Sequence, residues 1–302
     1  LTCCSKSNTK WMGIAMPMNA QPLSWSLRLT ILVASLNGIC LLRQTALNTT
    51  TTLNLTKPER FYIMSNYKLL SVGNNAKTVK GDGSEYLTAI LYLAPADNLQ
   101  GVNVCPMAVT AGCKAACLYT AGRGKMNSVQ TGRLRKTMLW RDDRQGFLAT
   151  LRQDIAKFTK YCLKRGIQPV VRLNGTSDIM WENYIDMETE VPRVQFYDYT
   201  KIYLRAYKDL PRNYHLTLSY SEANADYAEA ILNAHKLTGV SVAVVFRDKN
   251  TIPTSFAGSA VIDGDKDDLR FLDMPRRIVA LYAKGDAKKD DTGFVVDSKV
   301  AA

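Results

Sequence analysis

The sequence predicts an α/β protein with a mostly parallel sheet, and two observations support this. Short apolar runs rich in Val, Ile, Tyr and Phe recur along the chain, which is typical of buried strands. Several of these runs are separated by segments with helical periodicity, which is typical of βαβ units. Seven strands are expected, at residues 87–94, 169–173, 194–197, 215–219, 240–246, 259–262 and 276–283.

Two helices are expected between these strands. Apolar residues in 146–165 recur with a spacing close to 3.6 residues, which places them on one face of a helix. Gly166 follows this segment, at the position where a glycine commonly ends a helix. The second helix is expected at 223–237, with Asn224 or Ser221 as its N-cap.

The number of strands and their alternation with helices indicate the architecture. Seven predicted strands come close to the eight strands of a closed (β/α) barrel. We therefore expect an incomplete or distorted (β/α) barrel with mostly parallel strands. An open doubly wound sheet is the alternative, because it is built from the same βαβ units.

The composition is that of a globular protein with an excess of basic residues. The chain has 302 residues, of which 46% are hydrophobic, so it can bury a substantial core. The formal net charge of +12 favours a polyanionic partner such as nucleic acid or a phosphate-bearing ligand. Seven cysteines are too few for a disulfide scaffold in a chain of this length, so free thiols or bound metal in a reducing compartment are expected.

Residues 1–63 differ in character from the rest of the chain. They contain six basic residues and one acidic residue, a threonine run at 49–52 and an apolar stretch at 29–42. That stretch is short for a membrane span, which needs about 20 residues, although a weak anchor or signal is an alternative. Codons for residues 58–60, Pro-Glu-Arg, can spell a purine-rich ribosome-binding stretch at a suitable distance before Met64. We predict that 1–63 is an upstream translated or disordered segment and that 64–302 is a single α/β domain without a membrane span.

Polar residues follow the predicted strands on their carboxyl side. In parallel α/β folds, ligands bind outside the carboxyl ends of the strands, so these residues are candidates for a site. The alternative is that these residues are polar only because they lie in solvent-exposed loops, without a role in binding or catalysis. The candidates for acid/base catalysis are Asp178, Asp198 and Lys201, and the candidates for binding a cofactor or substrate are Asn174, Thr176, Ser177, Ser219 and Glu222.

Three cysteines lie close together in sequence and form the strongest candidate for a metal site. Cys113 and Cys117 are four residues apart and would share one face of a helical turn, and Cys105 precedes them. Three converging thiolates suit an iron–sulfur cluster with one open coordination position. Zinc is the alternative cofactor, although a structural zinc usually has four ligands. A third interpretation is that these are buried thiols of the core.

A basic segment follows the cysteines. Residues 114–165 contain thirteen basic residues and three acidic ones, so one face of the protein is expected to contact phosphate. A solvated basic face without a partner is the alternative. The candidates for contact with nucleic acid or phosphate are Arg123, Lys125, Arg133, Arg135 and Lys136.

Four sequence motifs resemble the bacteriophage "gene product 88" family, which occurs in phages and prophages. They are the three cysteines with Pro106, the segment 172–179, the segment 195–201 and the segment 261–265, and the resemblance covers residues 85–297. The barrel-like pattern and the three cysteines look like those of a remote relative of radical S-adenosylmethionine enzymes. The spacing of the cysteines differs from the usual spacing in that superfamily.

Two functional hypotheses follow. In the first, the chain is a radical S-adenosylmethionine-like enzyme that acts on a nucleic-acid or nucleotide substrate, with an iron–sulfur cluster and S-adenosylmethionine as cofactors. In the second, it is a non-catalytic phage protein that binds nucleic acid, with metal or thiols in a structural role. Either would work in the cytoplasm of the infected or lysogenic host cell. A classical hydrolase is not expected, because the chain has two histidines and no Gly-x-Ser-x-Gly motif.

Overall fold

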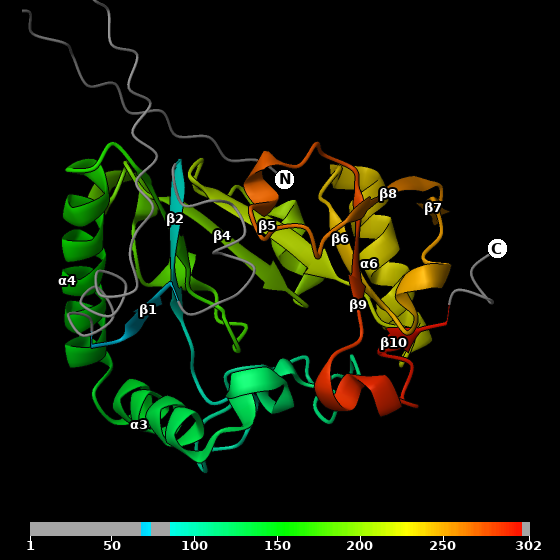
Figure 1. Cartoon of the computed structure of the whole chain (residues 1–302), viewed down its shortest axis with the longest axis horizontal. Helices are drawn as coiled ribbons and strands as arrows, with labels where there is room; N and C mark the ends of the chain where they lie inside the picture. The colour runs from blue at the N-terminus through cyan, green and yellow to red at the C-terminus, as the bar shows by residue number, and fades with distance from the viewer. Residues whose placement is uncertain (1–67, 74–84, 298–302) are drawn as a thin grey trace, which may run out of the picture. The chain divides into compact units, whose positions relative to one another are not determined.

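The computed structural model describes residues 68–73 and 85–297, which lie in one compact unit spanning residues 51–302 (Figure 1). The segment 1–63, predicted to be an upstream or disordered segment, lies outside the described residues, so that expectation stays a prediction. Within the described part of the chain, no helix combines the length and the apolar character that crossing a membrane requires.

The described residues form a mixed α/β structure around a ten-stranded, mostly parallel sheet. Its strand order is β1-β2-β3-β4-β5-β6-β9-β8-β7, with β10 paired to β6, and the sheet is not closed. Strands β2 to β6, β9 and β8 pair in parallel, whereas β1 and β7 pair antiparallel to β2 and β8 at the two edges. The strands are β1 Leu70–Val72, β2 Tyr86–Leu91, β3 Gln168–Arg172, β4 Gln195–Thr200, β5 Tyr214–Ser219, β6 Val242–Phe246, β7 Ser255–Phe256, β8 Ser259–Asp263, β9 Ile278–Tyr282 and β10 Val295–Val296.

All seven predicted strands are present, as β2 to β6, β8 and β9, with ends that differ by a few residues. The sequence did not predict β1, β7 and β10, because a strand of two or three residues carries too little periodicity to be recognised. Strand β10 pairs with the carboxyl end of β6, through Val295 with Val245 and Val296 with Phe246. Because β9 pairs along the whole other side of β6, β10 fills the gap where β5 and β6 separate.

Both predicted helices are present, as α4 Arg144–Leu163 and α6 Ala225–Thr238. Gly166 has a positive φ of 67°, as expected of a glycine after a helix, and the Asn224 side chain caps α6 by accepting a hydrogen bond from Tyr227 N. The structure adds α3 Asn127–Asp142 and the short α5 Met187–Glu190. The 3-10 helices are η1 Leu118–Thr120, η2 Gly122–Lys125, η3 Trp181–Asn183, η4 Tyr203–Tyr207, η5 Lys249–Thr251, η6 Arg270–Leu272 and η7 Gly285–Lys289.

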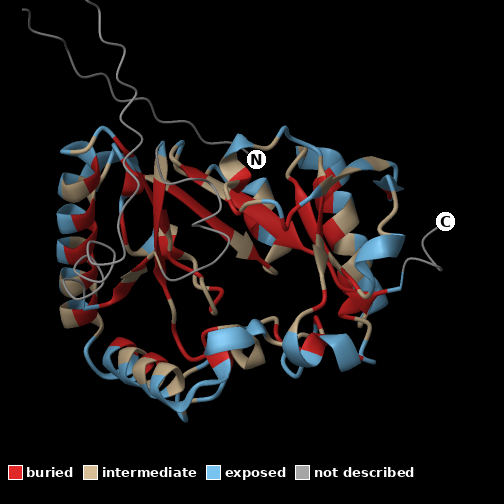
Figure 2. Cartoon of the chain, in the orientation of Figure 1, coloured by how far each residue is buried: buried red, intermediate tan, exposed pale blue. Residues whose placement is uncertain are grey.

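Helices α4 and α6 cover the same face of the sheet. The apolar face of α4 packs in one cluster with residues of β2 to β5, including Tyr214 and Leu216 of β5. Figure 2 shows that the strands of the sheet are largely buried, whereas the helices have one buried and one exposed face. The apolar face of α6 packs against β6, β9 and Leu218 of β5. Because side chains alternate along a strand, Tyr214, Leu216 and Leu218 project to one side, and both helices therefore lie on that side.

The opposite face of the sheet carries polar and aromatic side chains. Tyr197 and Tyr199 of β4 project there, and their hydroxyls donate hydrogen bonds of 2.9 and 3.1 Å to the carboxylate of Asp268. Arg172 of β3 donates to the same carboxylate at 2.9 Å. Phe271 of η6 packs against Tyr197, with ring centroids 6.0 Å apart and the ring planes tilted by 51°. The segment after β8 therefore covers part of the face that the helices leave open.

Candidate functional site

Residues 103–121, here called the cysteine loop, lie across the carboxyl ends of the strands (Figure 1). Three hydrogen bonds fix the loop to different parts of this edge. Asp178 N, after β3, donates to Val104 O at 2.7 Å, and Ser221 Oγ, after β5, donates to Ala111 O at 2.7 Å. Thr292 Oγ1, before β10, donates to Gly112 O at 3.1 Å. The loop is thus held where ligands bind in parallel α/β proteins.

All three thiols of the cysteine loop are free and partly buried. Cys105 Sγ lies 3.7 Å from Thr176 O, and Cys113 Sγ lies 3.8 Å from Ala108 O. Cys117 Sγ accepts a hydrogen bond from Tyr119 N at 3.5 Å. Burial raises the pKa of Cys105 to about 12, and the negative charges of Asp178, Cys117 and Cys113 add to this effect.

The thiols do not already surround a common point. Among the residues that the structure describes, no three His, Cys, Asp or Glu side chains are placed so that they could hold a metal ion. The segment 113–116 forms turns rather than the regular helical turn that the sequence suggests. What the structure supplies is a set of three soft sulfur donors on one loop, without a nearby histidine.

Lys201 and Arg133 bring positive charge to this set of thiols. Lys201 follows β4; its Nζ donates to Ser219 Oγ at 2.9 Å and lies 5.1 Å from the centroid of the Phe294 ring. Phe294 belongs to the same small apolar cluster against which Cys113 packs. Burial raises the pKa of Cys117, and the positive charges of Lys201 and Arg133 oppose that rise.

The five residues predicted to contact phosphate occupy different environments. Arg123, Lys125 and Arg135 are exposed. Lys136 is partly buried and donates to Leu69 O at 2.5 Å, and burial lowers its pKa to about 8. Arg133 is buried, with 8% of its surface exposed. The basic segment therefore presents three of these side chains to solvent and turns two inward.

Asp178 positions the backbone around Lys201. Its carboxylate accepts hydrogen bonds of 2.7 Å from both Thr200 Oγ1 and Lys201 N. Arg205 Nη1 lies 3.7 Å from the same carboxylate. Burial raises the pKa of Asp178, and these donors oppose the rise. Because the backbone amide of Asp178 also donates a hydrogen bond to Val104 O, Asp178 connects the turn after β4 to the cysteine loop.

Asp198 and Asn174 lie beneath the site, on the face that the helices cover. The Asp198 carboxylate accepts from Asn174 N at 2.7 Å and from Tyr214 OH at 2.9 Å. Asn174 Oδ1 in turn accepts from Ser177 Oγ, Ile179 N and Trp181 Nε1 at 2.9 to 3.0 Å. These groups are hydrogen-bonded to one another in the interior of the protein. The catalytic role of Asp198 and the ligand-binding roles of Asn174 and Ser177 stay predictions.

The remaining candidates line the edge of the site. Thr176 Oγ1 donates to Leu93 O at 2.5 Å, and its carbonyl oxygen faces Cys105. Ser219 accepts from Lys201, and Glu222 is exposed while its backbone amide donates to Gly293 O at 2.8 Å. The sequence did not single out Arg205, which lies fully buried below Asp178. A single arginine in a 3-10 helix of five residues carries no sequence pattern that distinguishes it from a solvated one.

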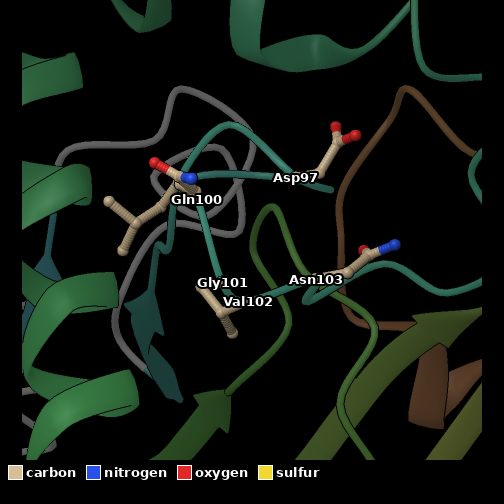
Figure 3. Close-up of a pocket in the computed structure, with 6 residues that line it drawn as sticks. Asp97, Gln100, Gly101, Val102 and Asn103 are labelled. Atoms are coloured by element: carbon tan, nitrogen blue, oxygen red, sulfur yellow. The ribbon is translucent and has the colours of Figure 1, made fainter.

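A depression of about 510 Å³ lies in the chain segment that leads into the cysteine loop (Figure 3). Asp97, Gln100 and Asn103 line it, but their side chains point in different directions. Asn103 Oδ1 accepts a hydrogen bond from Cys105 N at 2.8 Å. The depression is thus formed by one surface loop without converging polar groups, and the thiols remain the candidate site.

Gly112 is expected to be essential for docking of the cysteine loop. It has a φ of +63°, and a Cβ atom there would lie 2.6 Å from Ala223 Cβ and from Thr292 Oγ1. Gly122, in the same part of the chain, has a φ of +54°, but a Cβ atom there would meet no other atom within 4 Å. Gly122→Ala should cost about 1 to 2 kcal/mol from backbone strain alone. Gly112→Ala should cost about 1 to 3 kcal/mol more, because of overpacking.

Urea denaturation of the two variants checks this prediction. Equal losses of unfolding free energy in Gly112→Ala and Gly122→Ala would mean that the loop does not pack as closely as described. Limited proteolysis within the cysteine loop is expected to accelerate in Gly112→Ala only, because that substitution separates the loop from the strand ends.

These features define a class of protein: a mostly parallel α/β protein with a loop that carries three thiols across the carboxyl ends of its strands. The chain belongs to the Gene product 88 family of bacteriophages, whose family model matches residues 67–298. This confirms the resemblance drawn from the sequence motifs. No curated protein and no solved structure matches the chain.

Proposed function

We propose that Cys105, Cys113 and Cys117 bind an iron–sulfur cluster, with zinc as the alternative, at the mouth of an incomplete (β/α) barrel. The observation that carries this proposal is the placement of three thiols at the carboxyl ends of the strands, with the cations Lys201 and Arg133 in contact with aromatic rings beside them. The donor set suits a soft metal, because thiolate sulfur is the preferred ligand of iron–sulfur clusters.

The strand order supports the incomplete barrel. Strands β2 to β6 are neighbours in chain order, as in a barrel, and the order changes beyond β6, where β9 lies between β6 and β8. Helices α4 and α6 cover one face only, whereas a doubly wound sheet carries helices on both faces. In a barrel the helix-free face is the interior, and the cysteine loop would lie over its carboxyl-terminal opening.

The charges near the thiols support metal binding. Burial of Cys105 and Cys117 disfavours their thiolate forms, which a metal requires. The cations Lys201 and Arg133 act in the opposite direction on Cys117 and would balance part of the charge of a thiolate-bound cluster. Metal binding would also have to draw the three sulfur atoms closer together than they lie here. The loop is anchored at Val104, Ala111 and Gly112. Cys105 lies between two of these anchors, and Cys113 and Cys117 follow the last one, so all three can adjust.

The site suits an enzyme of the radical S-adenosylmethionine type. When bound, a cluster with three protein ligands would supply an open iron position for the amino and carboxylate groups of S-adenosylmethionine, and thereby one-electron chemistry. Lys201 is the acid/base candidate nearest to the thiols, since its amine is held by Ser219 rather than by a carboxylate. Asp178 keeps Lys201 in place through the backbone of the turn.

A second candidate function, nucleic-acid binding without catalysis, is favoured by the exposed basic side chains of Arg123, Lys125 and Arg135. Exposed cations on one segment are the electrostatic footprint that contacts phosphates. The same side chains would serve the enzyme if its substrate is a nucleic acid or nucleotide. We propose the cytoplasm of the infected or lysogenic host cell as the place of action in both cases.

Metal analysis of the full chain, purified without oxygen, tests the proposal. We expect about four irons and four sulfides per chain, with a visible absorption band, as for a [4Fe–4S] cluster. Cys113→Ala should reduce bound iron by more than about tenfold, because it removes a ligand. Cys162→Ala is the matched control, since Cys162 lies on the buried face of α4 in the core and its removal should not affect the metal content.

The outcomes separate the candidates. Iron that survives in Cys113→Ala would show that the cysteine loop does not hold it. One zinc per chain, lost in Cys113→Ala but not in Cys162→Ala, would establish the alternative metal. Absence of metal from the wild-type chain would overturn the cofactor proposal and favour the nucleic-acid-binding protein.

A further inference from the structure

Arg133 is a buried cation without a matching anion in the described part of the chain. Its side chain projects from α3 and is 8% exposed. Its Nε and Nη1 atoms have no hydrogen-bond partner, and no described carboxylate forms an ion pair with it. Buried guanidinium groups are normally paired, because an unpaired buried charge is costly. The exception requires an explanation.

The surroundings of Arg133 place its guanidinium group near Cys117. Its Cζ lies 5.0 Å from the centroid of the Tyr92 ring and 5.3 Å from that of Tyr119. Tyr119 is the residue whose backbone amide contacts Cys117 Sγ. Two aromatic rings thus fix the guanidinium beside Cys117 by cation–π contacts, which leave the edges of the group available for hydrogen bonds.

Lys201 approaches the same part of the cysteine loop from the sheet, since its Nζ lies 5.1 Å from the centroid of the Phe294 ring, which packs in one cluster with Ala116, the neighbour of Cys117. No described carboxylate lies within ion-pair distance of its amine, and its one hydrogen bond among the described residues goes to the neutral hydroxyl of Ser219. An ammonium group has three donors, so two of them stay available. Cys117 therefore has two cations at its side, each with unused donors.

We propose that Arg133 and Lys201 together bind an anionic group, a carboxylate or a phosphate, of the small molecule that occupies the thiol site. This inference rests on the proposed function in one respect: it places the ligand next to the cysteines. The inference goes beyond the proposed function by assigning the recognition of the ligand to Arg133 of α3 and Lys201 of the turn after β4. The guanidinium edge suits the paired oxygens of either anion.

Alkylation of Cys117 tests this inference without any bound metal. The full chain, kept reduced in the presence of a chelator, is treated with iodoacetate, which is anionic, or with iodoacetamide, which is neutral. The rate at Cys117 is measured for each reagent by peptide mass spectrometry. The ratio of the two rates cancels the fraction of thiolate, because both reagents attack the same thiolate.

We expect the iodoacetate-to-iodoacetamide ratio at Cys117 to exceed that of a small-molecule thiol. Arg133→Gln or Lys201→Gln should lower it roughly threefold to tenfold, because each removes one attracting charge. Arg135→Gln is the matched control, since it removes the same charge from an exposed position of the same helix and should leave the ratio unchanged. Because the two substitutions lie on different elements, the test can still be made if one variant misfolds. Circular dichroism would reveal such misfolding.

Competition distinguishes an anion site from a simple counter-charge. Millimolar inorganic phosphate or acetate, at ionic strength matched with sodium chloride, should slow alkylation of Cys117 in the wild type but not in Arg133→Gln. Stronger protection by phosphate would identify a phosphate ligand, and stronger protection by acetate a carboxylate. An unchanged ratio in Arg133→Gln, or protection by neither anion, would overturn the inference. Because these measurements use metal-free protein, a failure of the anion-site inference can be distinguished from a failure of the proposed metal binding.

Discussion

Arg205→Met is expected to lower the free energy of unfolding by about 3 to 5 kcal/mol, because it leaves buried carboxylates without their cation. The Arg205 side chain is 0% exposed. It donates to Glu182 at 3.0 and 2.7 Å through Nε and Nη2, and to Tyr214 OH at 3.0 Å. Asp178 lies 3.7 Å from its Nη1 atom. Methionine fills a similar volume, so the loss would reflect charge rather than a cavity.

Urea denaturation at neutral pH measures this loss, and a second arginine provides the control. Arg212 is 95% exposed and lies 3.9 Å from Glu188, so Arg212→Met should change the stability by no more than about 0.5 kcal/mol. The effect of Arg205→Met should also shrink as the pH falls, because burial raises the pKa of Asp178, so that this carboxylate can take up a proton and become neutral. A loss below about 1 kcal/mol at neutral pH would mean that solvent reaches these carboxylates when the arginine is removed.

Asp198 is expected to make the stability of the protein depend on pH between 5 and 8. Burial raises the pKa of this carboxyl from 3.8 to about 7, against the effects of Arg172 and its hydrogen-bond donors. Between these two values the folded chain retains a proton that the unfolded chain has released. Raising the pH through this range therefore favours unfolding, by up to about 1.4 kcal/mol per pH unit.

A comparison with Asp198→Asn isolates this contribution, because the amide does not titrate. From pH 5 to pH 8 the wild type should lose about 3 kcal/mol of unfolding free energy relative to Asp198→Asn. Asp209→Asn, at an exposed position, is the control for removal of a carboxyl. A constant difference between the wild type and Asp198→Asn would show that Asp198 is ionised throughout, stabilised by Tyr214 OH and Asn174 N.

Helix α3 shows why one element escaped prediction although its neighbours did not. In α4 the buried side chains Phe147, Leu151, Ile155 and Phe158 mark one face with apolar residues. In α3 the buried positions are Arg133, Thr137 and Trp140, which have the right helical spacing but are mostly polar. Hydrophobic periodicity cannot reveal a helix that buries an arginine and a threonine. The feature that hides α3 in the sequence is thus the one that brings Arg133 to the thiols.

Asp178, which follows β3, and Asp198, which lies on β4, show the same limit of sequence-based prediction at the site. From the sequence, Asp178 and Asp198 are equivalent, since both are carboxylates near the carboxyl end of a predicted strand. In the structure, Asp178 holds the turn that carries Lys201, whereas Asp198 lies on the helix-covered face with Asn174 and Tyr214. Strand alternation separates Asp198 from Tyr197 and Tyr199, whose hydroxyls lie on the other face.

The sequence by itself determined the seven main strands, the helices α4 and α6 with their caps, the family and the three clustered cysteines. These depend on local periodicity and on residues that are close in the chain. Only the tertiary structure decided that both helices cover one face, that β10 fills the gap beside β6, and that Arg133 and Lys201 meet at Cys117. Such juxtapositions arise from strand register and packing between segments far apart in the chain, which local patterns do not encode.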